Sequence, residues 1–218
     1  EDIHWPRTGL ICLENAHSNG RVIPLADMAA VWDVAQQHGV PVHLDGARVF
    51  NAAVHLGCDV SDITRYSDTV MCCLSKGLAA PVGSILAGPA AFIARARKNR
   101  KLLGGGLRQA GVLAAPGLLA LTDMVARLPE DHANARYLAA QLAALPGVEV
   151  NLDNVHINMV WFRLPAALDS NRLMAALAAA NIKANGPEHG LMRLVTHWQV
   201  GRNELDRVVA VFASVLAA

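Results

Sequence analysis

The chain has 218 residues and a mass of 23.1 kDa, enough for one large domain or two small ones with a sizeable buried core. Hydrophobic residues make up 53% and charged residues 17%, a composition that excludes an intrinsically disordered protein. The net charge of +1 gives no reason to expect binding to nucleic acid or to an anionic membrane, although residues 95–101 form one local basic cluster.

Short apolar runs alternate with helical patterns in the first half of the chain. Strands are expected at residues 9–13, 41–44, 69–74 and 82–87, helices at 25–38, 49–55 and from 90 to about 101, and a single turn at 62–66. This alternation predicts an α/β domain with a mainly parallel sheet and helices on both faces. Ligands bind beyond the carboxyl ends of such strands. Because Asn15, Asp45 and Lys76 follow three of them, we expect these residues to converge on one pocket.

The second half has a different pattern. Residues 109–128 are apolar nearly all round, which predicts a buried or interface helix. Helices are then expected at 132–145, 171–181 and 203–216, and strands at 149–152, 158–164, near Lys183 and at 191–197. This order predicts a smaller C-terminal α+β domain with a boundary near residues 129–135, so that residues 1–130 form the large domain and 131–218 the small one.

Targeting segments and metal or disulfide patterns are not evident in the sequence. Apolar stretches such as residues 208–218 are shorter than the roughly 20 residues that span a bilayer, and the first ten residues contain no signal-peptide core, so we expect a soluble, cytoplasmic protein. The four cysteines, Cys12, Cys58, Cys72 and Cys73, contain no C-x-x-C pair, which favours buried reduced thiols over a zinc site or a disulfide ladder.

Lys76 is the first candidate for chemistry. It follows a strand that is apolar on both faces and lies between Ser75 and Gly77, a position that would partly desolvate the ammonium group and favour a nucleophilic amine. Asp45 ends the neighbouring strand and has the charge needed to pair with a protonated pyridine nitrogen. An exposed loop lysine and an ordinary Asp-Gly turn remain the simpler alternatives.

Three longer segments are similar to motifs of a known enzyme family. Residues 43–52 (HLDGARVFNA), 73–84 (CLSKGLAAPVGS) and 100–111 (RKLLGGGLRQAG) resemble the low-specificity L-threonine aldolase family, as do residues 13–17 and 193–197. The resemblance implies pyridoxal 5'-phosphate as cofactor and the aspartate-aminotransferase-like fold of pyridoxal-phosphate-dependent transferases. It also implies cleavage of L-threonine or L-allo-threonine to glycine and acetaldehyde, and a homotetramer built from dimers that share active sites. A related β-eliminating lyase and a catalytically inactive fragment of the same fold are the alternatives.

The resemblance assigns four residues to the cofactor. Lys76 matches the lysine that bonds covalently to the cofactor aldehyde, and Asp45 matches the aspartate that pairs with the pyridine nitrogen. Arg48 matches an arginine near the phenolic oxygen of the ring, and Ser75 matches a hydroxyl on the phosphate side. A surface salt bridge for Arg48 and a turn cap for Ser75 are the simpler alternatives.

Four further residues are assigned to the substrate and to the subunit interface. Arg193 matches the arginine that binds the substrate carboxylate, for which a bidentate guanidinium is suited. His4 matches a histidine close to the β-hydroxyl that acts as the base, directly or through water. Lys101 and Arg108 match basic residues by the active site, and Arg108 is expected to reach the cofactor phosphate of a neighbouring subunit. An ordinary strand-end arginine and a loop histidine are the alternatives for Arg193 and His4.

Some features depart from the family pattern. Ala16 stands where the family usually has threonine, and Trp198-Gln199 replaces an apolar-Asp pair. The chain begins at Glu1 rather than methionine, and family members carry a further segment ahead of the matching point, including a phosphate-binding turn and a histidine that stacks on the cofactor ring. We therefore expect an N-terminally incomplete chain.

Overall fold

The computed structural model describes residues 3–217 and divides into two compact units. Of the described residues, the first unit contains 3–17 and 22–126, and the second contains 18–21 and 127–217. The sequence places the domain boundary at residues 129–135, whereas the structure divides after Ala126 and also joins the short segment Ser18–Arg21 to the second unit.

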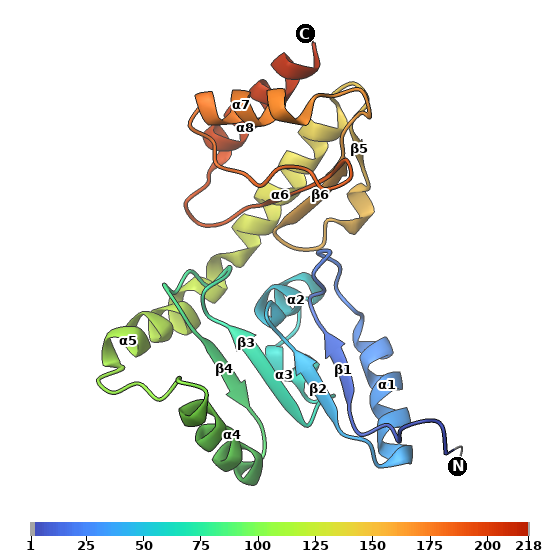
Figure 1. The fold of residues 1–218 in the computed structure, drawn as a ribbon, viewed down its shortest axis with the longest axis vertical. Coiled ribbons are helices and arrows are strands. Elements are labelled where there is room, and N and C mark those ends of the chain that lie inside the picture. Colours follow the sequence, from blue (N-terminus) through green and yellow to red (C-terminus); the bar gives the residue numbers. More distant parts are fainter. Residues whose placement is uncertain (1–2, 218) are drawn as a thin grey trace. The chain divides into compact units, whose positions relative to one another are not determined.

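A four-stranded sheet forms the centre of the first unit (Figure 1). Its strands lie in the order β1 (Ile11–Glu14), β2 (Val42–Asp45), β3 (Thr69–Cys73) and β4 (Ser84–Ala87). The first three strands are parallel, and β4 is antiparallel to β3 at the edge. The expected α/β fold with a mainly parallel sheet is thus confirmed.

Helix α1 (Leu25–His38) connects β1 to β2, helices α2 (Val49–Leu56) and α3 (Val60–Thr64) connect β2 to β3, and helices α4 (Ala90–Leu102) and α5 (Gly111–Leu119) follow β4. Gly39 ends α1 with a left-handed backbone at φ 60°, and Asp59 begins α3 with a reciprocal capping box. Helices α1 and α3 contact each other, so they pack on the same face of the sheet, as expected when successive right-handed crossovers advance in one direction.

Burial of alternate residues fixes the orientation of β2, the strand that ends at Asp45. Val42 and Leu44 on β2 are fully buried, whereas the alternate residues His43 and Asp45 point to the other face. A hydrogen bond of 2.8 Å joins His43 Nδ1 to Thr69 Oγ1 on β3. Burial of two residues in four therefore determines which face of the sheet Asp45 occupies.

The segment 111–143 is helical throughout but changes its winding. Helix α5 contains Pro116 and is followed by a π-helical turn, Ala120–Met124, then a 3-10 turn, Val125–Arg127, and then α6 (Leu128–Ala143). Proline lacks the N–H that a regular helix needs, and irregular winding close by is a common consequence. Residues 111–143 are also long enough to cross a membrane, and an 18-residue window within them has a mean hydropathy of 1.4. This is weak evidence for a membrane span, because core helices of soluble proteins meet the same test.

The second unit is an α+β layer structure. Its antiparallel sheet has the order β5 (Glu149–Val150), β6 (Met159–Arg163) and β7 (Leu191–Val195), with a short 3-10 turn at Leu152–Asn154. Helices α6, α7 (Ser170–Ala179) and α8 (Arg202–Leu216) pack on it around a core in which the rings of Phe162 and Phe212 meet edge to face at 5.6 Å.

The strand expected near Lys183 is not formed. Asn181 adopts a left-handed backbone at φ 57° after α7, and Ile182 N–H bonds back to Leu177 O, so the chain closes the helix instead of starting a strand. Only an isolated bridge between Glu188 and Leu191 follows before β7 begins.

A buried polar cluster joins the start of α6 to the end of β7 in the second unit. The Asp131 carboxylate is fully buried; its Oδ1 accepts a hydrogen bond from Arg127 at 3.0 Å, and its Oδ2 has no hydrogen-bond partner among the described residues. Burial raises the pKa of Asp131 despite the opposing charge of Arg127. Thr196 Oγ1 donates to the Asp131 carbonyl at 2.6 Å, so the cluster holds the end of β7, the strand that carries Arg193.

All four cysteines are free thiols, as expected. The expectation that they are buried is wrong for Cys12, which is exposed, while Cys58, Cys72 and Cys73 are half-buried. Cys12 lies on β1, an edge strand of the sheet, and such a strand leaves part of its surface uncovered.

Candidate functional site

Lys76 lies in a tight turn just beyond β3. Leu74 N–H donates to Gly83 O at 2.9 Å, and Ala79 N–H donates to Lys76 O at 2.9 Å, while Leu74 and Leu78 are buried. The turn therefore has a fixed backbone that presents the side chain of Lys76. Lys76 itself is exposed, so the partial desolvation expected from the sequence is not found in this chain, because the turn extends past the edge of the sheet.

Asp45 is the last residue of β2, directly beside β3. Its Oδ1 accepts a hydrogen bond from Ala47 N–H at 3.0 Å, and its Oδ2 makes no hydrogen bond or ion pair with another described residue. Asp45 aligns with Met71 in the register of the two parallel strands. Asp45 and Lys76 therefore follow adjacent strands at the same edge of the sheet, as the sequence predicts, and one carboxylate oxygen remains available for a ligand.

Gly46 fixes the direction in which the chain leaves β2. Its N–H donates to Met71 O at 2.8 Å, and a Cβ at this position would lie 2.7 Å from the same oxygen and 3.0 Å from Val49 Cβ. Backbone atoms cannot move aside as a flexible side chain does. Only glycine therefore permits this approach of β2 to β3 without displacing Asp45.

We expect Gly46→Ala to lower the free energy of unfolding by about 1–3 kcal/mol, because the added methyl group overpacks a backbone contact. Urea denaturation measures the change. Gly9→Ala is the matched control, since a Cβ at Gly9 meets nothing within 4 Å and should change the stability little. Equal stability of the Gly46→Ala variant and the original protein would contradict the close approach.

Ser75 and Arg48 complete the edge that Asp45 and Lys76 share. Ser75 is exposed and its hydroxyl forms no hydrogen bond with the described residues, and Arg48 is half-buried at the start of α2. A carboxylate oxygen, an ammonium group and a hydroxyl thus face outward from one edge without partners in residues 3–217. This donor set suits a ligand that combines a protonated ring nitrogen, an aldehyde and a phosphate, so it fits pyridoxal 5'-phosphate.

Asn15 does not join this group, contrary to the prediction. Its side chain is fully buried: Nδ2 donates to Ile23 O at 3.1 Å and Oδ1 accepts from Ile23 N–H at 3.1 Å. The amide therefore fixes the loop between β1 and α1 and has no free group to offer a ligand.

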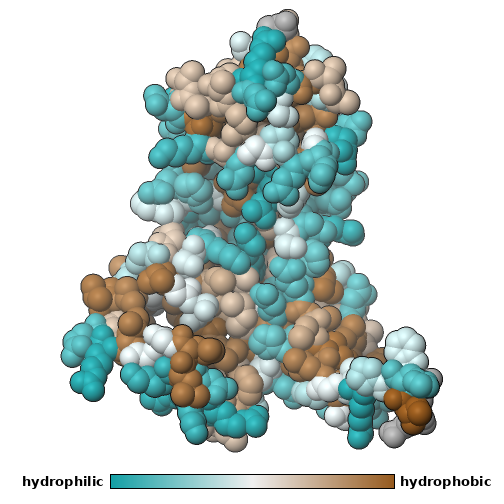
Figure 2. Space-filling model, in the orientation of Figure 1, coloured by the Kyte–Doolittle hydropathy of each residue, from teal (hydrophilic) through white to brown (hydrophobic). Residues whose placement is uncertain are grey.

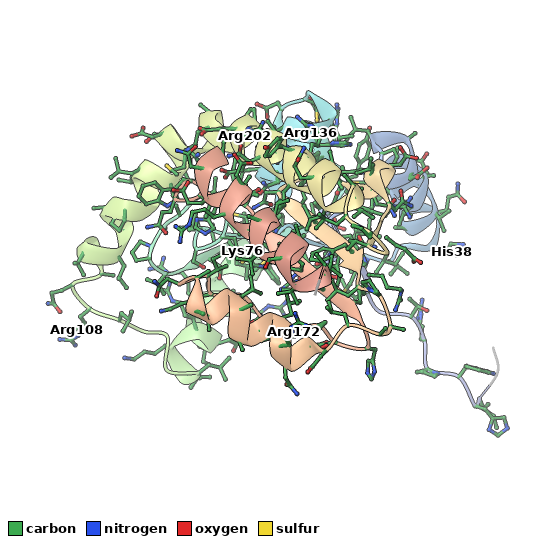
Figure 3. All side chains as sticks on the ribbon, turned by 90° about the horizontal axis from the view of Figure 1, so that it is seen from above. His38, Lys76, Arg108, Arg136, Arg172 and Arg202 are labelled. Carbon is green, nitrogen blue, oxygen red and sulfur yellow. The ribbon has the colours of Figure 1, made fainter. Side chains whose placement is uncertain are left out.

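Three predicted site residues lie elsewhere in the first unit. Lys101 is exposed in the last turn of α4, and Arg108 is exposed on the loop that follows; Figure 3 shows Arg108 well away from Lys76. His4 precedes β1, whereas Lys76 follows β3, so the two come from segments at opposite ends of parallel strands. Within this chain Arg108 thus lies apart from Lys76, and the roles of Lys101 and His4 stay predictions.

Arg193 lies in the second unit, in the middle of β7. Its side chain is exposed, and its guanidinium carbon lies over the ring of Trp161, 5.4 Å from the ring centroid. No carboxylate of residues 3–217 lies within 4.0 Å of its guanidinium group. No sequence motif points to Trp161 as a site residue. Its place in a strand between the apolar residues Val160 and Phe162 does put it on the opposite face of the sheet from them.

No group of three or more His, Cys, Asp or Glu side chains in the described part of the chain is arranged to hold a metal ion.

Comparison with known sequences finds one matching family profile and several similar proteins. The profile described as beta-eliminating lyase matches residues 1–165. The low specificity L-threonine aldolase of Escherichia coli is 42% identical over 217 residues, which cover 100% of this chain and 63% of that protein. The low-specificity L-threonine aldolase 1 of Arabidopsis thaliana is 39% identical, with 97% and 60% coverage. The chain thus spans about three fifths of the length of these relatives.

Solved structures with the same fold have lower sequence identity. A structure from Listeria monocytogenes that is described as an L-allo-threonine aldolase superposes on this chain with a TM-score of 0.80 at 17% identity. The superposition covers 97% of this chain and 62% of the Listeria chain. The threonine aldolase of Leishmania major gives a TM-score of 0.76 at 20% identity, with 99% and 64% coverage. These structures establish the fold of the chain.

Proposed function

This chain belongs to the beta-eliminating lyase family, and from that premise we propose that it is the core of a pyridoxal-phosphate-dependent threonine aldolase. The reaction is the cleavage of L-threonine, L-allo-threonine or a related β-hydroxy-α-amino acid between Cα and Cβ. The products from threonine are glycine and acetaldehyde, and the atoms balance without another co-reactant.

The observation that carries this proposal is the placement of Asp45 and Lys76 at the carboxyl ends of two adjacent parallel strands, Asp45 as the last residue of β2 and Lys76 just beyond β3. It occurs in a chain that is 42% identical along its whole length to a low specificity L-threonine aldolase. A carboxylate and an amine at one edge of a sheet match the two ends of a pyridoxal ring, its nitrogen and its aldehyde.

Four residues of the first unit would hold the cofactor. Lys76 would bond to its aldehyde carbon through Nζ, and the free Oδ2 of Asp45 would accept a hydrogen bond from the protonated ring nitrogen and so keep it protonated. Arg48 would lie by the phenolic oxygen, and Ser75 and the Arg108 of a neighbouring subunit would bind the phosphate. When bound, pyridoxal phosphate supplies an electron sink for the bond that breaks at Cα.

The remaining residues act on the amino acid. Arg193 would bind the substrate carboxylate through two parallel N–H···O bonds, which fixes the orientation of Cα. His4 would accept the proton of the β-hydroxyl group as the bond between Cα and Cβ breaks, and an imidazole nitrogen suits the role of a general base. Lys101 would add positive charge near the substrate.

A β-eliminating lyase is the second candidate, because that is the description of the matching family profile. Such an enzyme would use the same lysine and aspartate but expel a leaving group from Cβ and release a 2-oxo acid and ammonia. Elimination and aldol cleavage are therefore distinguished by their products.

The test begins with the purified chain and added pyridoxal phosphate. After unbound cofactor is removed, we expect a cofactor absorbance band outside the range of the protein, and release of glycine from threonine, allo-threonine or phenylserine. Release of ammonia with 2-oxobutyrate from threonine or allo-threonine, or with phenylpyruvate from phenylserine, would favour the β-eliminating lyase. A chain that shows no cofactor band is not an active aldolase by itself and would contradict the proposal.

The exposed apolar surface of the first unit supports an assembly of several subunits. Figure 2 shows hydrophobic patches, coloured brown, on the first unit. Large apolar side chains are exposed on β4, on α5 and in or next to the last turn of α4: Ile85, Leu86, Leu102, Leu103, Val112, Leu118 and Leu119. Soluble monomers rarely expose so many neighbouring apolar residues. We propose a cytoplasmic homotetramer, a dimer of dimers with shared active sites, that acts in threonine catabolism and glycine biosynthesis.

A further inference from the structure

The cross-strand pair of Trp161 and Arg193 has a specific geometry. The two residues are directly opposed in the antiparallel register of β6 and β7, so their side chains point to the same face of the sheet. The other face carries Val160 and Phe162, which pack against the helices in the core of this unit. Trp161 is only half-buried and therefore lies outside that core.

The indole ring, and not its N–H group, makes the contact with Arg193. The guanidinium carbon lies 5.4 Å from the ring centroid, within the range of a cation–π interaction. Trp161 Nε1 is buried and forms no hydrogen bond with the described residues. Its ring face is thus what Trp161 offers to Arg193.

A comparison with Arg163 on the same face of the sheet shows what the ring does. Arg163 Nη1 donates to His189 O at 3.2 Å, so that guanidinium is already occupied by the protein backbone. Arg193 has no hydrogen bond or ion pair with residues 3–217, and its N–H donors remain free for a ligand. A cation–π contact restricts the rotamers of a long side chain and does not occupy its N–H donors.

We propose that Trp161 is a positioning residue that holds the guanidinium plane of Arg193 ready for the substrate carboxylate. This inference rests on the proposed function, in which Arg193 binds that carboxylate. The ring reduces the conformational entropy that Arg193 loses when substrate binds, so its contribution appears in substrate affinity more than in the rate of bond cleavage.

The test compares Trp161→Leu, Trp161→Phe and the control Trp198→Leu, a substitution of an exposed tryptophan in the same unit. We expect Trp161→Leu to raise the KM for threonine about 5- to 20-fold, with kcat changed less than about 2-fold. Trp161→Phe restores most of the affinity because it keeps an aromatic face and loses only an unpartnered N–H. Trp198→Leu leaves KM unchanged.

A double-mutant cycle separates positioning from a structural role. In an Arg193→Lys background, Trp161→Leu should raise KM less than about 2-fold, because the planar group that stacks is gone. Equal increases in both backgrounds, or an unchanged KM in Trp161→Leu, would overturn the inference. If Trp161→Leu does not fold, Trp161→Met, which also removes the aromatic face but keeps a long apolar side chain, is measured in the two backgrounds and decides the same question.

A different result tests the proposed function, independently of the role of Trp161. Original protein that binds the cofactor but cleaves none of the β-hydroxy amino acids contradicts the aldolase proposal. The dissociation constant for glycine, measured by calorimetry in the same variants, then decides whether Trp161 positions Arg193.

Discussion

Replacing Lys76 with alanine should abolish the cofactor absorbance band and reduce aldolase activity on the order of 10³-fold or more. The amine is the only group at this edge of the sheet that is expected to bond covalently to the cofactor aldehyde. The backbone hydrogen bonds of the turn, such as Ala79 N–H to Lys76 O, do not involve the side chain and remain in the variant. The substitution should therefore remove chemistry and leave the fold intact.

The measurement is an absorbance spectrum of the protein with added pyridoxal phosphate, together with the rate of glycine release. Lys98→Ala is the matched control, because Lys98 is an exposed lysine of the same unit that lies on α4 outside the proposed site. It should keep both the band and the activity. A fully active Lys76→Ala protein would exclude the proposed role of this lysine.

Local signals in the sequence predict the first unit well. Helix α1 occupies residues 25–38 as expected, because Gly39 provides the left-handed residue that ends it. The strands that carry Asp45 and lead to Lys76 are found within two residues of their expected positions, because short apolar runs are bounded there by polar turns. The shared edge of the sheet follows from the alternation of strand and helix alone.

Side-chain partners distant in the sequence account for what could not be predicted. The position of Asn15 at a strand end predicts a ligand-binding residue, but its side-chain amide forms hydrogen bonds with the backbone of Ile23, eight residues later. Trp161 and Arg193 become neighbours only through the register of β6 and β7, which the periodicity of each strand does not specify. Polarity at a strand end is therefore a weaker indicator of a site than an unpartnered group at that end.

Exposure of Lys76 shows a second reason. An apolar strand predicts burial of the strand itself, whereas the turn that follows leaves the sheet and is covered only if other segments or subunits pack over it. Desolvation of the amine therefore depends on whether anything packs over this turn, and a sequence pattern within one turn carries no information about that.

The charge of Asp45, separated from its role in the turn, is tested by Asp45→Asn. Asparagine keeps an oxygen that accepts the hydrogen bond from Ala47 N–H, so the turn after β2 should remain and the stability should change by no more than about 0.5 kcal/mol. The negative charge opposite the ring nitrogen is lost. We expect kcat at saturating cofactor to fall about 10²- to 10³-fold, because electrostatic stabilisation of the developing charge is usually the largest catalytic contribution of a site.

Saturation with cofactor is the essential condition of this experiment, since the same substitution should also weaken cofactor binding. Asp27→Asn, in the exposed first turn of α1, is the control that changes the net charge equally and should leave kcat unchanged. If Asp45→Asn loses activity only through cofactor affinity and regains it at saturation, the carboxylate serves binding alone. A low kcat at saturation assigns to Asp45 the stabilisation of charge on the ring during the reaction.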